Sequence, residues 1–335
     1  YSLPVTASWE LDVFGRMRNS KKQAKALYAQ SEDYRQAVRT QLIAGIANTY
    51  YTLLMLDEQL DISRQTEEAW KETVASTRAL MNAGLANESA VSQMEAAYYQ
   101  VQGSVLDLQQ QISQVENSLA LLLAETPRNY ERGMLAKQQF PADFSIGIPV
   151  RMLSSRPDVR SAERTLEAAF YGTNAARSAF YPSITLSGSA GWTNSAGAMI
   201  INPGKFLASA VGSLTQPLFN RGQVVAQYRI ARAQQEEAAL GFQQTLLNAG
   251  SEVNDALIAY QTSQGKRILL DKQITSLQTA LRSTTLLMEH GNTTYLEVLT
   301  SRQSLLSAQL SQTANHFTEI QSLINLYRAL GGGQE

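Results

Sequence analysis

The sequence predicts a mostly helical protein with a small β part, built as two copies of one long helical hairpin. The first observation behind this prediction is an internal repeat: a shift of about 207 residues places Gly84 on Gly291 and Val91 on Val298. A shift of about 205 residues aligns SWELDVFGR, from Ser8, with SLTQPLFNR, from Ser213, and we expect the difference of two residues to lie inside a helix. The other two observations are two very long helical stretches without proline and three segments that alternate with a period of two.

Each repeat is predicted to contain a long helix that leads through a glycine-bearing turn into a shorter return helix. The long helices cover residues 16–81 and 223–289, and at 1.5 Å per residue each is about 100 Å long. The return helices, 88–125 and 294–330, reach only about 55 Å. A further helix of about 23 residues begins at Pro157, where the proline and Asp158 both suit a first helical turn. The predicted domains are therefore a first repeat over 1–126, an irregular equatorial segment over 127–156, and a second repeat over 157–335.

The remaining segments are predicted to be strands, each with one apolar and one hydroxyl-rich face. In SITLSGSAGW, from Ser183, the apolar residues alternate with serine, threonine and glycine, and residues 206–218 pair back to form a hairpin over 181–219. The first eleven residues alternate in the same way. The second repeat has two strands and the first has one, so by symmetry we expect the native chain to carry another helix and strand, roughly 50 to 60 residues, before Tyr1.

Composition excludes several classes of function. The net charge of −1 provides no basic surface field for nucleic acid, and the absence of cysteine excludes disulfides and thiolate metal sites. The apolar runs all fall short of the 18 residues or so of a membrane-spanning helix. His290 and His316 have no partner at metal-ligand spacing, and catalytic and phosphate-binding motifs are missing, so no enzyme, cofactor or metal is predicted.

The strands favour a membrane channel. A hairpin at one end of a helix of about 100 Å cannot share a core with the rest of the chain, and four strands are too few to close a barrel, for which about eight are needed. Open edges therefore call for other copies of the chain. Strands of about ten residues with one apolar and one hydroxyl face are typical of outer-membrane barrels. A soluble helical scaffold is the alternative that the long helices alone would allow.

Four segments resemble the TolC-type outer-membrane factors of Gram-negative efflux systems, in particular the lipoprotein branch that serves resistance-nodulation-division (RND) pumps. They are SWELDVFGRMRN from Ser8, SRPDVRSAERTLEAAFYGTNAARSAFYPSITLSGSAGW from Ser155, QPLFNRGQVVAQYRIARAQQEEAA from Gln216, and LYRALGGG from Leu326. The resemblance covers essentially the whole chain.

This resemblance implies a homotrimer in the outer membrane, with a 12-stranded β-barrel in lipid that continues into a periplasmic α-barrel. It also implies a periplasmic adaptor and an inner-membrane RND-type transporter as partners, and a passive exit duct for small molecules as the function. An outer-membrane channel for type I protein secretion is the alternative within the same family. Members of this branch are usually lipidated on an N-terminal cysteine, and this sequence contains none.

The family's closed periplasmic tip gives candidate aperture residues. In the family, acidic residues after the second hairpin turn narrow the pore; the matching positions here are Glu297 and Thr300, and the first repeat offers Glu88 and Ala90. A ring of carboxylates would attract cations and repel anions. Glu297 can equally be an acid that favours a helix N-terminus, and for Glu88 the helix-terminus role is the favoured interpretation.

Two further sets of candidate residues lie at the ends of the long helices. The turns expected to dock the adaptor are Gly84, Leu85, Ala86 and His290, Gly291, Asn292, and both glycines suit a left-handed backbone after a helix. At the opposite ends, Arg16, Arg221 and Pro217 lie where strands lead into long helices. We expect them to join the barrel to the tunnel, although either arginine can instead be solvated.

Overall fold

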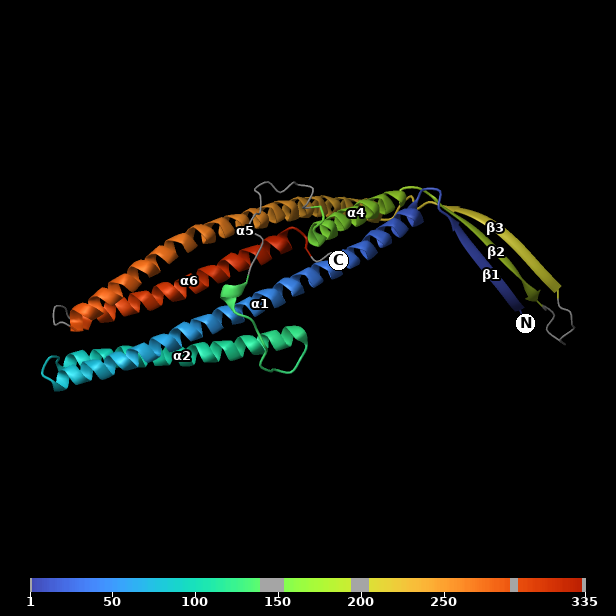
Figure 1. The fold of residues 1–335 in the computed structure, drawn as a ribbon. Coiled ribbons are helices and arrows are strands. Elements are labelled where there is room, and N and C mark those ends of the chain that lie inside the picture. The colour runs from blue at the N-terminus through green and yellow to red at the C-terminus, as the bar shows by residue number, and fades with distance from the viewer. Residues whose placement is uncertain (1, 139–153, 194–204, 290–294, 333–335) are drawn as a thin grey trace. The chain divides into compact units, whose positions relative to one another are not determined.

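The computed structural model describes residues 2–138, 154–193, 205–289 and 295–332 of the chain (Figure 1). The elements follow in the order β1 (Ser2–Leu11), α1 (Arg16–Asn82), α2 (Glu88–Leu123), the short 3₁₀ helix η1 (Leu135–Lys137), α4 (Pro157–Ser178), β2 (Ser183–Thr193), β3 (Lys205–Thr215), α5 (Gln223–Glu289) and α6 (Tyr295–Ala329). The predicted mostly helical fold with a small β part is confirmed, and the predicted helix bounds agree to within two residues.

The indel between the two repeats lies in a link, not inside a helix as we expected. Helices α1 and α5 both contain 67 residues, and their first and last residues are offset by the same 207 positions. The link between β1 and α1 is shorter than the link between β3 and α5, since α1 follows Leu11 by five positions and α5 follows Thr215 by eight. The two long helices therefore match residue for residue.

The chain divides into two compact units that each take parts of both repeats. One unit contains residues 1–37 and 157–248, and the other contains residues 38–156 and 249–335. The first unit holds the sheet, α4 and the first parts of α1 and α5. The second holds α2, η1, α6 and the remainder of the two long helices.

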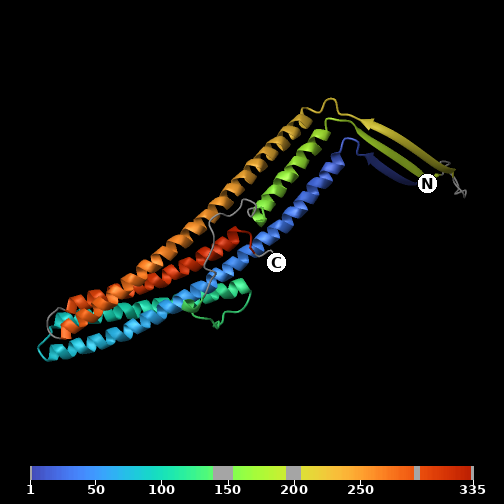
Figure 2. The same cartoon turned by 45° about the horizontal axis from the view of Figure 1, so that its top comes forward.

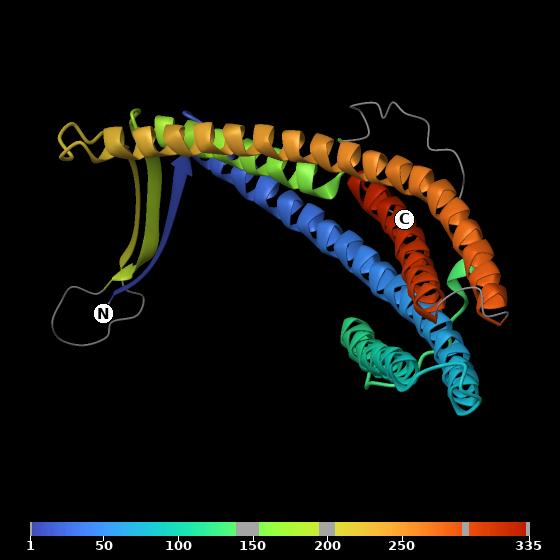
Figure 3. The same cartoon turned by 90° about the vertical axis from the view of Figure 1, so that its left-hand side faces the viewer.

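The strands of the first unit form one antiparallel sheet in the order β1-β2-β3 (Figure 3). Ser2 pairs with Thr193 and Leu11 with Ile184, while Ser183 pairs with Thr215 at the far edge. The register is unbroken along both ladders, so residues of one face in β2 lie opposite residues of the same face in β1 and β3. The predicted hairpin is confirmed as β2–β3.

Helix α4 lies between the first parts of α1 and α5 within the same unit (Figure 2). On the α1 side, Asp33 pairs with Arg160 at 3.1 Å, and Gln30 Nε2 donates to Thr165 Oγ1 at 2.9 Å. On the α5 side, Thr173 Oγ1 donates to the Ala231 carbonyl at 3.0 Å. These contacts place three helices side by side below the sheet's connecting links.

The second unit has apolar clusters where its helices meet. Leu53 and Leu56 of α1 pack on Ile112 and Leu119 of α2, and Val253 and Ala256 of α5 pack on Leu326 and Ala329 of α6. A third cluster joins Leu54 of α1, Leu135 of η1 and Ile320 of α6. Helix α1 therefore contacts both return helices. None of the helices in the described residues combines the length and the apolar composition of a candidate membrane span.

Candidate functional site

The sheet presents an exposed apolar face. Cross-strand rows on this face join Leu3, Trp192 and Phe206 near one end, and Trp9 and Leu186 near the other. All five side chains are exposed, and the Trp192 and Phe206 rings meet edge to face with centroids 5.2 Å apart. The middle of the face is made of small residues, since Ala7 lies opposite Gly188 and Gly188 opposite Ala210. Large apolar side chains exposed in this number need an apolar medium or a partner.

The opposite face of the sheet carries hydroxyl groups that bond across the strands. Ser189 and Ser209 share a hydrogen bond between their Oγ atoms at 2.8 Å, and Ser213 Oγ donates to the Thr185 carbonyl at 3.3 Å. Leu207 and Val211 of β3 share this face and interrupt it. The predicted division into an apolar and a hydroxyl face holds along β1 and β2.

Gly191 brings β1 unusually close to β2. A Cβ atom added at Gly191 would lie 2.3 Å from the Leu3 carbonyl oxygen and 2.6 Å from the Pro4 Cα, which no side chain can accommodate without moving the β1 backbone. A Cβ added at Gly188 would meet only the Ser209 carbonyl oxygen at 3.7 Å, an ordinary contact. The glycine at 191 is therefore required by the pairing of β1 with β2.

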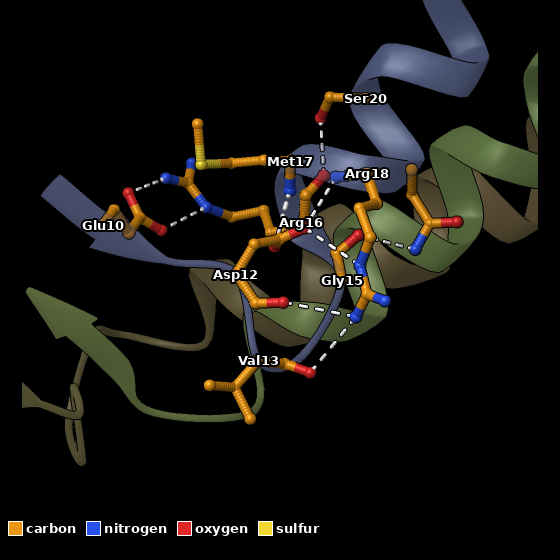
Figure 4. Close-up of polar contacts among 9 residues, drawn as sticks. Glu10, Asp12, Val13, Gly15, Arg16, Met17, Arg18 and Ser20 are labelled. Carbon is orange, nitrogen blue, oxygen red and sulfur yellow. Dashed lines mark hydrogen bonds and ion pairs between the residues drawn. The ribbon is translucent and has the colours of Figure 1, made fainter.

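The link from β1 into α1 is ordered by two acidic residues (Figure 4). Asp12 accepts hydrogen bonds from the N–H groups of Met17 and Arg18 at 2.9 and 2.8 Å, which satisfies two of the unpaired donors in the first turn of α1. Desolvation raises the pKa of Asp12, but these hydrogen bonds and the charge of Arg18 lower it by more, so the pKa lies below its ordinary value. Glu10, the penultimate residue of β1, makes a two-point ion pair with Arg16 at 3.1 and 2.5 Å.

The predicted junction residues are arranged differently in the two links. Arg16 connects the first turn of α1 to the end of β1 through Glu10. In the second link Pro217 occupies the position that aligns with Asp12, so this link has no equivalent capping acid. Arg221 and Gly222 both adopt a left-handed backbone, with φ of 58° and 78°, before α5 begins. Sequence reasoning missed Asp12, although an aspartate shortly before a long helical stretch is a recognised start signal.

The first helix-hairpin turn ends α1 in a Schellman motif. The Leu85 N–H donates to the Leu80 carbonyl and the Gly84 N–H to the Met81 carbonyl, both at 2.9 Å, and Gly84 has φ of 73°. The predicted left-handed role of Gly84 is confirmed. Leu85 is exposed and Ala86 is half-buried. The second turn, with His290, Gly291 and Asn292, lies outside the described residues.

The predicted aperture residues fall into exposed and buried positions. Glu297 and Thr300 are both exposed in the first turns of α6, where a spacing of three residues puts them on one face. Glu88 is exposed in the first turn of α2, but the helix is capped by Asn87, whose side chain accepts from the Ala90 N–H at 2.9 Å. Ala90 itself is buried, so its side chain is not available to line an aperture in this arrangement.

An aromatic cluster fixes the start of α6 against α1 and α2. Trp70 and Met94 are fully buried and are covered by Tyr295 and Leu299 of α6. The Arg302 guanidinium lies over the Trp70 ring, 5.7 Å from its centroid, and burial lowers the pKa of Arg302 against the opposing effect of Glu72. Because Val298 is also buried, the first turn of α6 is held with Glu297 and Thr300 on its free side.

Arg132 anchors the irregular equatorial segment to the two helices of the first hairpin. Its guanidinium forms two contacts with Asp57 of α1, Nε to Oδ2 at 2.5 Å and Nη2 to Oδ1 at 3.3 Å, and one with Glu116 of α2, Nη1 to Oε1 at 2.7 Å. Burial of the guanidinium lowers its pKa, but the carboxylates of Glu116 and Asp57 outweigh this effect and raise the pKa of Arg132 above its ordinary value. Arg132 was not among the site residues that the sequence predicts.

In the part of the chain that the structure describes, histidine and acidic side chains form no group able to hold a metal ion. The exposed functional groups are instead distributed at the ends of the elements: a two-faced sheet, two strand–helix links and the starts of two return helices. Such an arrangement provides exposed surfaces at the ends of the described elements.

Comparisons with known proteins agree on one family. The family model "Outer membrane efflux protein" matches residues 1–125 and 148–332. The "Cation efflux system protein CusC" of Escherichia coli K12 is 28% identical over 338 residues, covering 99% of this chain and 73% of that protein. The "Solvent efflux pump outer membrane protein SrpC" of Pseudomonas putida is 31% identical over 339 residues, covering 99% of this chain and 71% of that protein.

Solved structures give the same result for the fold. A crystal structure of CusC superposes with a TM-score of 0.93 at 28% identity, covering 99% of this chain and 78% of the solved chain. The outer membrane protein VceC from Vibrio cholerae superposes with a TM-score of 0.90 at 26% identity, covering 100% of this chain and 80% of the solved chain. The resemblance to outer-membrane efflux channels that the sequence motifs indicated is thereby confirmed.

Proposed function

The chain belongs to the outer membrane efflux protein family, and we propose that it is the exit duct of a tripartite pump that carries small molecules out of the cell. Membership makes it an outer-membrane efflux channel and not an enzyme. The proposal adds an RND-type transporter in the inner membrane and a periplasmic adaptor as partners. A soluble scaffold is excluded by the family.

One observation carries the proposal: the sheet has an exposed apolar face and an opposite face of bonded hydroxyl groups. An apolar face with tryptophan near both ends suits lipid, and serine and threonine on the other face suit water. Strands β1 and β3 are both open edges of the sheet within the described residues. Open edges of this kind are satisfied when copies of a chain close into a barrel.

We propose that three copies form this barrel and that their helices form a tube in the periplasm. The long helices, 67 residues each, give a length of about 100 Å, which is far more than a bilayer requires. The hairpin turns would then meet at the far end of the tube, where the adaptor docks. Gly84, Leu85 and Ala86 would contribute to this docking surface from the first hairpin.

At the tip, we propose that Glu297 faces the pore with Thr300 one turn further along α6. Three Glu297 carboxylates, one from each copy, would favour cations over anions. The support is local: Val298 is buried and Tyr295 and Arg302 are half-buried, so this side of α6 packs inward and Glu297 remains exposed. Glu88 is exposed at the start of α2 and is a weaker candidate, and Ala90 is not a lining residue in our proposal.

Ion selectivity of the purified channel in a planar bilayer tests the tip. Glu297→Gln keeps the size of the side chain and removes its charge, so we expect the reversal potential in a salt gradient to move towards no preference. Glu88→Gln is the matched control and should have a smaller effect. If Glu297→Gln leaves selectivity and conductance unchanged while Glu88→Gln alters them, Glu297 serves only the helix N-terminus.

The cargo is proposed as a class of small molecules. CusC is named for cation efflux and SrpC for solvent efflux, and the two relatives are similar to this chain over the same length. Deletion of the gene in its host should raise sensitivity to drugs, solvents or metal ions, and plasmid-borne expression should restore resistance. Unchanged sensitivity together with loss of a secreted protein would instead identify a secretion duct.

A further inference from the structure

Each of the two strand–helix links contains a pair of apolar residues, and the two pairs align between the repeats. Only in the first link is the phenylalanine of the pair covered by another side chain. Val13 and Phe14 of the first link align with Leu218 and Phe219 of the second at the shift of about 205 residues. Phe14 is 40% exposed, whereas Phe219 is 99% exposed and its neighbour Leu218 is 81% exposed. A phenylalanine ring left wholly in water is unfavourable, so the second link needs a cover that the first already has.

The first link shows what the cover is. The Phe14 ring stacks on Tyr181, with ring centroids 4.8 Å apart and planes only 7° from parallel. Tyr181 lies two residues before Ser183, the first residue of β2, and β2 is the strand that pairs with β1. The rule is therefore that the phenylalanine leaving one strand stacks on the residue that enters the next strand of the sheet.

Applied to the second link, this rule points outside the chain's own sheet. Phe219 leaves β3, and β3 pairs with β2 on one side while its other side is open in the described residues. In a barrel closed by copies of the chain, the strand next to β3 belongs to another copy. We infer that Phe219, supported by Leu218, packs against the second copy that adjoins the open edge of β3, and so forms a contact between copies beneath the barrel.

The inference rests on the proposed trimer and adds to it the residues that join one copy to the next. The second link suits such a contact because Pro217 fixes its backbone and the Gln216 amide donates to the Phe180 carbonyl at 3.1 Å, which ties the link to the end of α4. Phe180 in turn packs edge to face on Tyr228 of α5, with centroids 5.6 Å apart. The link is thus held in place while Leu218 and Phe219 extend outward.

Photo-crosslinking tests the contact in the full chain purified in detergent and in lipid vesicles. The photoreactive analogue benzoylphenylalanine replaces Phe219 in one variant and Phe14 in a matched variant, and native mass spectrometry records the oligomeric state of each sample. We expect the analogue at position 219 to produce covalent dimers and trimers on illumination. At position 14 it should react within its own chain, because Tyr181 already covers that ring.

Each outcome decides between specific alternatives. If the sample is trimeric but position 219 yields only lipid adducts or no product, the contact between copies is refuted and the proposed function stands. If the protein is a monomer in lipid, the proposed trimer fails and the contact fails with it. As a second measurement, Phe219→Ala should lower the temperature at which the trimer dissociates, and Phe219→Trp should restore it; equal dissociation temperatures for all three proteins would also contradict the inference.

Discussion

Replacement of Arg132 by methionine tests how the irregular segment is held to the helical hairpin. The change keeps most of the side-chain volume and removes three N–O contacts, two with Asp57 and one with Glu116. It also leaves the Asp57 and Glu116 carboxylates without the cation that both of them contact. We therefore expect the second compact unit to lose stability.

The magnitude of the loss follows from the exposure of the Arg132 and Asp57 side chains. Breaking a buried ion pair by removing one partner costs about 3–5 kcal/mol. The Arg132 side chain is 17% exposed and that of Asp57 is 33% exposed, and solvent screening on the Asp57 side reduces the expected loss to about 2–3 kcal/mol. For a unit of this size, that loss corresponds to a fall in Tm of roughly 4–12 °C.

Thermal unfolding followed by far-ultraviolet circular dichroism provides the assay. Lys71→Met is the matched control, because the ion pair of Lys71 with Glu68 is exposed on both sides and should contribute nothing measurable. A double-mutant cycle with Asp57→Asn then isolates the coupling between Arg132 and Asp57. A Tm for Arg132→Met equal to that of the control, or a cycle without coupling, would refute the account of this anchor.

Three further predictions concern the turn, the sheet and a half-buried acid. Gly84→Ala should lower the free energy of unfolding by about 1–2 kcal/mol, because Gly84 has a left-handed backbone. Gly103 lies in the interior of α2 with open space around it, so Gly103→Ala should raise the free energy of unfolding by up to about 1 kcal/mol. Changes of the same sign in both variants would contradict this prediction. Gly191→Ala should prevent β1 from pairing with β2, measured as loss of heat-resistant β structure, while Gly188→Ala should fold normally. Burial raises the pKa of Glu58 above the ordinary 4.5; the charge of Asp61 raises it further, and His316 opposes the shift. The folded state therefore binds more protons than the unfolded state. The free energy of unfolding falls as the pH rises from about 4.5 through the raised pKa. Glu58→Gln should therefore raise Tm at neutral pH and flatten the pH dependence just above pH 4.5, and an unchanged profile would show that Glu58 does not cause it.

The sequence predicted the elements well because their signals are local. Long proline-free stretches bounded by glycine and proline give helix ends to within two residues, as the Schellman turn at Gly84 shows. Period-two alternation in β2 predicted both faces of the sheet, because side chains in a strand must point to opposite sides.

The contacts that hold the candidate sites depend on distant pairs and were not predicted. Arg132 meets Asp57 across 75 positions, and no periodic pattern marks either residue. The stack of Phe14 on Tyr181 follows only from the register of β1 against β2. Asp12 is the exception, since its place before α1 could have identified it as a capping residue.

The central claim is that copies of this chain form a water-filled channel through a membrane. Conductance of the purified protein in a planar bilayer, with the oligomeric mass determined on the same preparation, tests this claim most directly. We expect a trimer that inserts and gives discrete steps of ionic current. A monomer that remains in solution without detergent and leaves the bilayer electrically silent would contradict it.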